Sequence, residues 1–288
     1  MKAPAFEYVK PRSLTDIFSL LQQYGDEARL LAGGQTLLAT LNMRLSEPSV
    51  LIDLSAISEL RGISLAGSML RIGAMVTHSE IEASALVAEH APLLPMAAPH
   101  IAHRAIRNLG TLGGSIAYAD PAAEWPTCLL ALDGVVVAKS ATGERRIRAD
   151  DFFIDLYTTT LLPGEIIVAC EFPVATIKQW CDFDELARRH GDYAIVGLAG
   201  AGQRVENTLT QVRLVFLGLG PTPLRSLRAE AIINGQPLTD ALIEQAVVAL
   251  KGELSAVGDL TSDAATKMHL AGVLLKRMLM KRLASKPA

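Results

Sequence analysis

The first 60 residues alternate short apolar runs with one amphipathic stretch. Ser13 is a favourable N-cap for the run Leu14-x-x-Ile17-Phe18-x-Leu20-Leu21, whose spacing predicts a helix that ends at Gly25. A second helix is predicted after the Gly-Gly turn. The remaining elements are short strands, so this part reads as a small α/β unit, with strands at 6–9, 29–32 and 50–54 and helices at 14–25 and 36–45.

Residues 61–176 form a second mixed unit. Thr77 is placed to cap a turn or helix, and a helical region over 83–106 is interrupted by three prolines, Pro92, Pro95 and Pro99. A glycine-rich segment precedes another helix at 122–132. Strands are predicted at 70–74, 135–138, 145–148 and 166–172. Pro173 then marks a boundary, because proline cannot donate to a sheet ladder.

Residues 177–288 have a different rhythm. Two long β-like stretches, 193–203 and 211–219, precede helical patterns at 239–251 and 263–284. Strands followed by helices favour an α+β layer. The glycines in Gly197–Gly202 predict a closely packed strand. The whole chain is therefore α+β, with one region over 1–176 (subdomains about 1–60 and 61–176) and a smaller C-terminal α+β domain with an antiparallel sheet over 177–288.

Composition narrows the class of protein. Half of the 288 residues are hydrophobic and a fifth are charged, as in compact soluble proteins, and the net charge of −3 disfavours nucleic acid as a partner. The basic cluster Lys276, Arg277, Lys281, Arg282 and Lys286 is interpreted as the end of a final helix.

Cysteine usage and apolar runs bear on cofactors and compartment. The thiols Cys128, Cys170 and Cys181 are widely spaced and form no Cys-x-x-Cys pair, so no metal site is expected, and they read as buried free thiols. The N-terminus lacks a signal-peptide core, and no apolar run reaches the ~20 residues of a membrane span. The expected location is the cytoplasm.

Two glycine segments depart from ordinary core-building, Leu31–Leu37 and Asn108–Ser115. Glycines allow a positive φ and a close approach of the main chain to a ligand, and consecutive backbone N–H groups bind anions. Thr36, Thr111 and Ser115 add hydroxyl donors. Both segments could instead be tight turns, and from composition the two interpretations are about evenly matched. A P-loop and a Rossmann fingerprint are absent.

Three longer motifs identify a family. AGGQTLL at 32–38, RNLGTLGGSIAYADPAAEWP at 107–126 and RRHGDYAIVG at 188–197 occur in order. Together they resemble the FAD-binding medium subunit of the molybdenum hydroxylase family, which includes carbon monoxide dehydrogenase and xanthine dehydrogenase. The likeness extends over essentially the whole chain.

The resemblance implies a two-subdomain FAD-binding fold of the vanillyl-alcohol-oxidase (PCMH) type, with FAD extended between the subdomains and its pyrophosphate on the two glycine segments. It implies cofactor contacts at Ala32, Gly33, Gly34, Gln35, Thr36, Leu37, Thr111, Gly113, Gly114 and Ser115. It also implies Asp120 beside the nucleotide with Glu124 as a weaker candidate, the Leu161 amide near the isoalloxazine edge, Tyr193 against one ring face, and His78 close to the flavin.

Simpler interpretations exist for three of these residues. Asp120 before Pro121 suits a turn and a helix cap, Tyr193 suits an ordinary strand aromatic, and His78 alone suits a surface or capping position. One position departs from the family. Relatives often have lysine where this chain has Glu185, and a carboxylate near the ring would disfavour an anionic reduced flavin. No binding role is assigned to Glu185.

The resemblance implies an electron relay with no catalytic residue and no metal in this chain. A large partner subunit with a molybdopterin-type molybdenum cofactor would oxidise the substrate. A small partner with two [2Fe–2S] clusters would pass electrons to the FAD held here, which releases them to an external acceptor that the sequence does not identify. The assembly is expected to be a dimer of heterotrimers. The alternatives are a stand-alone flavin oxidase and a non-enzymatic nucleotide-binding module. Carbon monoxide, an N-heterocycle, an aldehyde or a purine all remain candidate substrates.

Overall fold

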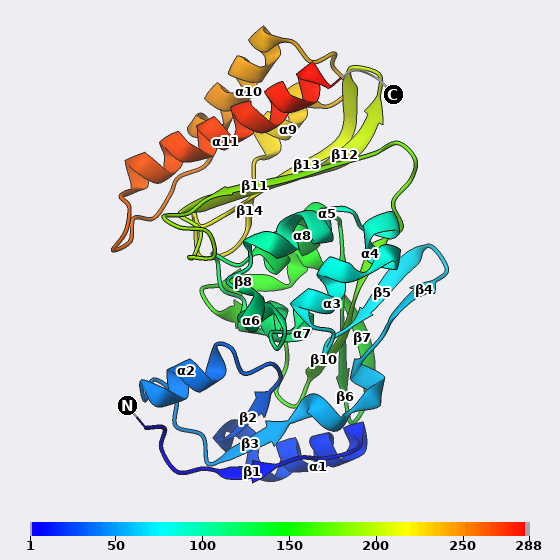
Figure 1. The fold of residues 1–288 in the computed structure, drawn as a ribbon, viewed down its shortest axis with the longest axis vertical. Coiled ribbons are helices and arrows are strands. Elements are labelled where there is room, and N and C mark those ends of the chain that lie inside the picture. The colour runs from blue at the N-terminus through cyan, green and yellow to red at the C-terminus, as the bar shows by residue number, and fades with distance from the viewer. Residues whose placement is uncertain (1, 286–288) are drawn as a thin grey trace.

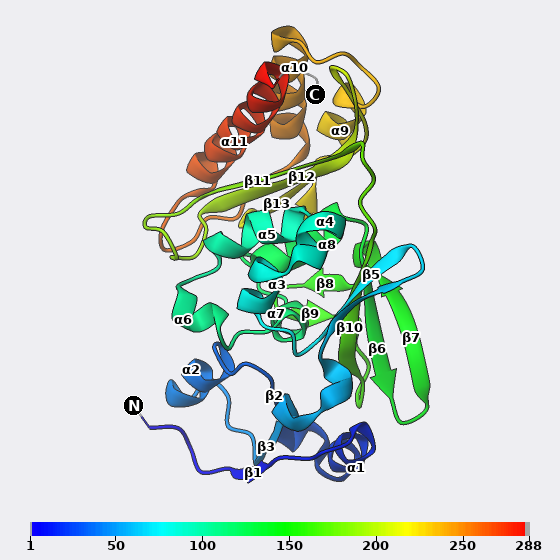
Figure 2. The same ribbon diagram turned by 45° about the vertical axis from the view of Figure 1, so that its right-hand side comes forward.

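Three layers of structure are stacked along the long axis of the molecule. A computed structural model describes residues 2–285. The N-terminal unit lies at one end, the second unit in the middle, and the C-terminal sheet with its helices at the other end (Figures 1 and 2).

The N-terminal unit is a parallel sheet of three strands in the order β1-β3-β2. Ser13 caps α1 by accepting a hydrogen bond from Asp16 N at 3.1 Å, and Gly25 ends that helix at φ 50°, as predicted. The central strand is buried at every residue. The elements are β1 Glu7–Val9, α1 Leu14–Tyr24, β2 Ala28–Leu31, α2 Leu37–Asn42 and β3 Val50–Asp53.

The middle unit is an antiparallel sheet in the order β4-β5-β10-β6-β7, with helices on one side. Its strands are β4 Ile63–Ala66, β5 Met69–Gly73, β6 Val135–Ser140, β7 Gly143–Arg148 and β10 Ile166–Pro173, and a hairpin adds β8 Phe153–Asp155 and β9 Thr158–Thr159. Thr77 caps helix α3, His78–Ala83, as predicted. The region predicted as helical over 83–106 is a series of short helices: α4 Ala85–His90, α5 Leu93–Ala97 and α6 Arg104–Arg107. Pro92 and Ser84 lie at helix starts, so these residues divide the region.

The second glycine segment differs from its predicted form. Gly113 and Gly114 lie in helix α7, Leu112–Tyr118, instead of in a loop. Thr111 caps this helix by accepting from Gly114 N at 3.2 Å. A Cβ at Gly113 would lie 2.5 Å from the Cβ of Ala74, so the glycine is needed for packing of the helix against the end of β5. Helix α8, Glu124–Ala131, follows.

The C-terminal layer is an antiparallel sheet covered on its outer face by helices (Figure 1). The two predicted stretches form strands β12 and β13 with shifted ends, and the glycines of Gly197–Gly202 lie in a strand, as predicted. Two strands and one helix were not predicted. The elements are β11 Gln179–Leu186, β12 Val196–Val205, β13 Thr208–Leu217, β14 Leu224–Arg225, α9 Leu227–Ile233, α10 Asp240–Glu253 and α11 Ala264–Ala284. Short 3-10 helices occur at Gly25–Glu27, Leu54–Ala56, Ser58–Leu60, Ala98–His100 and Ala149–Asp151.

The C-terminal sheet is buried on both faces. Ala199, Val215 and Leu217 pack into the core of the middle unit, whereas the alternating Leu198 and Phe216 pack under the outer helices. Successive residues of a strand point to opposite faces, so a single sheet joins two apolar clusters. The division of the chain near residue 176 stays a prediction, because one continuous core crosses it.

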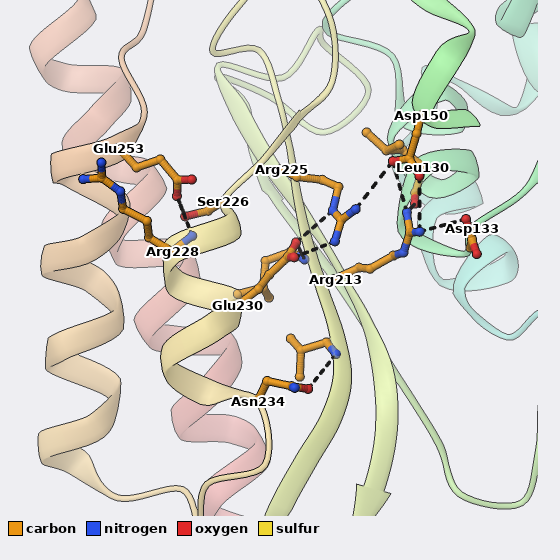
Figure 3. Close-up of polar contacts among 12 residues, drawn as sticks. Leu130, Asp133, Asp150, Arg213, Arg225, Ser226, Arg228, Glu230, Asn234 and Glu253 are labelled. Atoms are coloured by element: carbon orange, nitrogen blue, oxygen red, sulfur yellow. Dashed lines mark hydrogen bonds and ion pairs between the residues drawn. The ribbon is translucent and has the colours of Figure 1, made fainter. Parts of the chain in front are cut away.

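A charge network adds to this junction (Figure 3). Arg213 of β13 donates to Leu130 O at 3.0 Å and to Asp133 Oδ1 at 2.8 Å, both in the middle unit. Arg225 reaches Asp150 at 3.5 Å and also pairs with Glu230 at 2.6 Å. These arginines therefore connect the C-terminal sheet to the middle unit and to α9.

Several sequence-based expectations about single residues are met. Cys128 and Cys170 are buried free thiols, and Cys181 is partly buried. Cations of α11 pair with acids: Lys276 with Glu244, Arg277 with Asp184 and Lys281 with Asp182. Lys286 lies outside the described residues. Within residues 2–285, no helix has both the length and the apolar character needed to cross a membrane.

Candidate cofactor site

A cavity of about 610 Å³ lies between the N-terminal and middle units. This volume falls in the range of about 300–1,000 Å³ typical of small-molecule and cofactor pockets. Both glycine segments contribute to its wall. Thirteen of the candidate residues line it: Ala32, Gly33, Gly34, Gln35, Thr36, Leu37, His78, Thr111, Gly113, Gly114, Ser115, Asp120 and Tyr193.

The first glycine segment presents unpaired backbone donors. Gly34 has φ 71°, which turns the chain between β2 and α2. The amide N–H groups of Gly33, Gly34, Gln35 and Thr36 donate to no acceptor in the described part of the chain. The Gln35 side chain instead donates to Gly33 O at 3.0 Å. Consecutive free amides at a cavity wall suit an anion.

The two glycine segments touch each other. A Cβ at Gly33 would lie 2.2 Å from Leu109 O, and one at Gly114 would lie 3.5 Å from the Cβ of Ala32. Only glycine at position 33 allows this approach. The segments, far apart in the chain, therefore make one continuous surface.

The second segment contributes differently from its predicted role. The amides of Leu112 and Gly113 donate to Val76 O and Ala74 O, and those of Gly114 and Ser115 donate to Thr111. None of its glycines has a positive φ, because these residues begin a helix. This segment therefore offers the hydroxyl groups of Thr111 and Ser115 in place of a row of free amides.

His78 is neither exposed nor a cap, since Thr77 caps α3 and His78 is 6% exposed. Its Nδ1 accepts a hydrogen bond from Trp125 Nε1 at 2.8 Å. Burial, with a smaller effect of Arg107, lowers the pKa of His78 to about 4. The imidazole is therefore neutral near pH 7, with its proton on Nε2, a donor at the cavity wall. Sequence reasoning missed Trp125.

Asp120 and Tyr193 lie at the same wall. Asp120 Oδ1 accepts from Ala122 N at 2.9 Å, so the turn-forming role is present, and the residue also lines the cavity. Burial raises the pKa of Asp120. Tyr193 is 72% exposed and precedes β12, so it lies in a loop and not in the predicted strand.

Leu161 is the one candidate that is not at the cavity wall. Its side chain packs against the core of the middle unit, and its amide donates to Thr159 Oγ1 at 3.3 Å. The amide assigned to the isoalloxazine edge is thus engaged locally.

Comparison with known proteins decides the family. Residues 4–175 match the family described as "FAD binding domain in molybdopterin dehydrogenase", and residues 182–282 match "CO dehydrogenase flavoprotein C-terminal domain". The chain belongs to this family of flavoproteins.

Relatives in this family match over nearly the full length. The nicotine 6-hydroxylase medium subunit of Paenarthrobacter nicotinovorans is 39% identical over 97% of this chain and 98% of that protein. The 6-hydroxypseudooxynicotine dehydrogenase complex subunit alpha of the same organism is 38% identical over 98% and 96%. A solved structure of carbon monoxide dehydrogenase from Hydrogenophaga pseudoflava has a TM-score of 0.94 at 35% identity, covering 99% of this chain and 100% of that chain. The predicted family and fold class are confirmed.

FAD fits the residues at this flavoprotein cavity. Four unpaired amides and two hydroxyl groups can neutralise a diphosphate, and Gly33 leaves no Cβ between the two segments. The tyrosine and the neutral imidazole supply an aromatic surface and a donor for a polar ring system. The donor set therefore agrees with the cofactor that the family binds.

Two carboxylates were underestimated from the sequence. Glu124 lines the cavity, and burial together with Glu185 raises its pKa to about 8. Glu185 does not line the cavity. Its charge acts on Glu124 and so influences the cavity through that residue.

Proposed function

We propose that this chain binds FAD in the cavity between its first two units and relays electrons within a multi-subunit molybdenum hydroxylase. The observation that carries the proposal is the cavity itself, where both glycine segments meet and four backbone amides remain unpaired. When bound, FAD supplies the ability to accept electrons singly or in pairs. The chain supplies binding, orientation and local charge.

Each lining residue has a proposed contact. The amides of Gly33 to Thr36 and the hydroxyl groups of Thr111 and Ser115 bind the diphosphate, with Ala32, Leu37, Gly113 and Gly114 shaping the wall. Asp120 accepts a hydrogen bond from the nucleotide. Tyr193 packs on one face of the isoalloxazine, and His78 donates from Nε2. The Leu161 amide reaches the ring edge only if its hydrogen bond to Thr159 opens.

The proposed partners hold the other redox centres. No group of three or more metal-binding side chains occurs among residues 2–285. Relatives are named as a medium subunit and as a subunit of a dehydrogenase complex. We therefore assign the molybdenum cofactor to a large partner and two [2Fe–2S] clusters to a small partner, assembled as a dimer of heterotrimers in the cytoplasm.

Purification of the chain tests the proposal. Alone, it should be yellow or become yellow with added FAD, and candidate substrates should not bleach it. Co-expressed with its neighbours, it should elute with one large and one small chain, and substrate should then reduce the flavin. A colourless chain that refuses FAD would favour a scaffold. Bleaching of the isolated chain by substrate would favour a stand-alone oxidase.

A further inference from the structure

Glu124 is an acidic residue at the cavity wall that forms no ion pair with a basic side chain in the described part of the chain. It begins helix α8 and lines the cavity, whereas no ion pair with a lysine or arginine forms at its carboxyl within residues 2–285. The titratable groups that act on it or feel its charge are Glu185, Asp120, Cys128 and Tyr193. None of them is a cation, so only a backbone hydrogen bond favours the charged form of Glu124, and burial and the neighbouring carboxylates outweigh it.

Glu185 lies on strand β11, and its charge acts on Glu124. Its side chain is 4% exposed, and its Oε2 is buried without a hydrogen-bond partner. Its Oε1 lies 3.6 Å from Nδ1 of His100, slightly beyond a hydrogen bond. A buried carboxylate oxygen without a partner is costly, so this oxygen is a ready hydrogen-bond acceptor for a water.

Two histidines, His100 and His190, lie between Glu185 and the surface. The His100 ring lies 5.2 Å from the Phe183 ring and 6.4 Å from the His190 ring, centroid to centroid. His100 has a 29% exposed side chain, and His190 is exposed. Histidine exchanges protons readily near neutral pH. Titratable groups therefore extend from solvent through His190, His100 and Glu185 to Glu124 at the cavity.

We propose that Glu124 is a proton-binding group linked to the redox state of the flavin, and that Glu185, His100 and His190 connect it with solvent. This inference rests on FAD binding in the cavity. Two electrons from the iron–sulfur partner that enter with one proton leave one negative charge on the ring. That charge favours protonation of the Glu124 carboxylate, which takes a second proton from solvent and becomes neutral. On reoxidation both protons are released.

The protonation state of Glu124 in the oxidised protein sets the pH range in which reduction takes up the additional proton. Because burial and Glu185 raise its pKa to about 8, the group is neutral at lower pH in the oxidised protein. Above that pH, Glu124 is charged before reduction and neutral afterwards. Reduction then takes up one additional proton per two electrons, which adds about 30 mV per pH unit to the slope of the two-electron potential.

The experiment is a spectroelectrochemical titration of the FAD-loaded chain from about pH 6.5 to about pH 9.5. The wild-type protein should show a slope that steepens near pH 8. Glu124→Gln should show one constant slope. Glu185→Gln removes a like charge and should move the change in slope to lower pH. Glu244→Gln, an exposed carboxylate paired with Lys276, is the matched control and should follow the wild type.

Each outcome decides the matter. A wild-type line with one slope overturns the proposal, as does a change in slope that persists in Glu124→Gln or is unmoved by Glu185→Gln. If Glu124→Gln does not bind FAD, the slopes of the wild type and of Glu185→Gln still test the proposal. His100→Phe should keep the equilibrium potentials and slow the response of the flavin absorbance to a pH jump several-fold; an unchanged rate removes the histidine path. A chain that never binds FAD refutes the proposed function instead.

Discussion

Replacement of Gly33 by alanine would push the two glycine segments apart. The added Cβ would lie 2.2 Å from Leu109 O, and real Cβ contacts are essentially never under 3.0 Å. The backbone of Gly33 is outside the positive-φ region, so alanine itself is compatible with the local conformation. The steric conflict with a backbone oxygen therefore accounts for the whole effect, and the segments must separate by about 0.8 Å or more.

This displacement acts on both stability and FAD affinity. Overpacking of this kind costs about 1–3 kcal/mol of folding free energy. Moving the amides of Gly33 and Gly34 from the diphosphate would weaken one or two charge-assisted hydrogen bonds, each worth about 1.5–3 kcal/mol. The dissociation constant of FAD should rise about ten- to thousandfold.

Titration of FAD into the apoprotein, followed by quenching of flavin fluorescence, measures this affinity, and urea unfolding measures the stability. Gly252→Ala is the control, because a Cβ in helix α10 would meet nothing within 4 Å. That variant should keep its FAD affinity and gain about 0.5–1 kcal/mol from helix propensity. If Gly33→Ala binds FAD within about threefold of the wild type, the contact between the segments does not set the site.

Three further predictions follow from buried polar groups. Lys267→Met should lower the free energy of unfolding in urea by about 1–3 kcal/mol, because the ammonium, 6% exposed, donates to Gly218 O and pairs with Asp259 at 2.7 Å. The control Lys276→Met, at a half-exposed lysine, should change the free energy of unfolding by less than about 0.5 kcal/mol, and equal losses in the two variants would contradict the argument. His78 binds a proton in the unfolded chain near pH 6.5 but in the folded chain only near pH 4, so its contribution of at most about 3 kcal/mol to stability is present above pH 6.5 and lost as the pH falls to about 4. His78→Asn should flatten the pH dependence of the urea denaturation midpoint between those two values, and an unchanged pH dependence would refute the assignment. Arg213→Leu should lower the free energy of unfolding by about 1–3 kcal/mol and make the C-terminal sheet open separately from the middle unit in hydrogen exchange. A single, unshifted unfolding transition would show that the apolar core alone joins the two units.

Local chemistry made several elements predictable. Helix α1 follows from its serine cap, its apolar spacing and the terminating Gly25, all contained within a short segment. Strand β12 is predictable from its apolar run. Its glycines do not interrupt the strand because they serve packing: a Cβ at Gly200 would lie 2.7 Å from the Trp180 ring. These features depend only on neighbours in sequence or on a strong composition signal.

Strand β11 was missed for a tertiary reason. Its residues Asp182 and Asp184 face α11 and pair with Lys281 and Arg277, contacts that form only in the folded chain. Because the sheet is buried on both faces, the strand lacks the apolar–polar alternation of a half-buried strand.

By itself, the sequence determined the family, the fold class and thirteen of the residues that line the cavity, because motifs and local patterns are carried by short segments. Only the tertiary structure decided which donors are free, since Gly113 and Gly114 prove to be helical. It alone also brought Trp125 to His78 and Glu185 to Glu124. Protonation depends on removal from water and on the distance to other charges, and neither is set until the chain has folded.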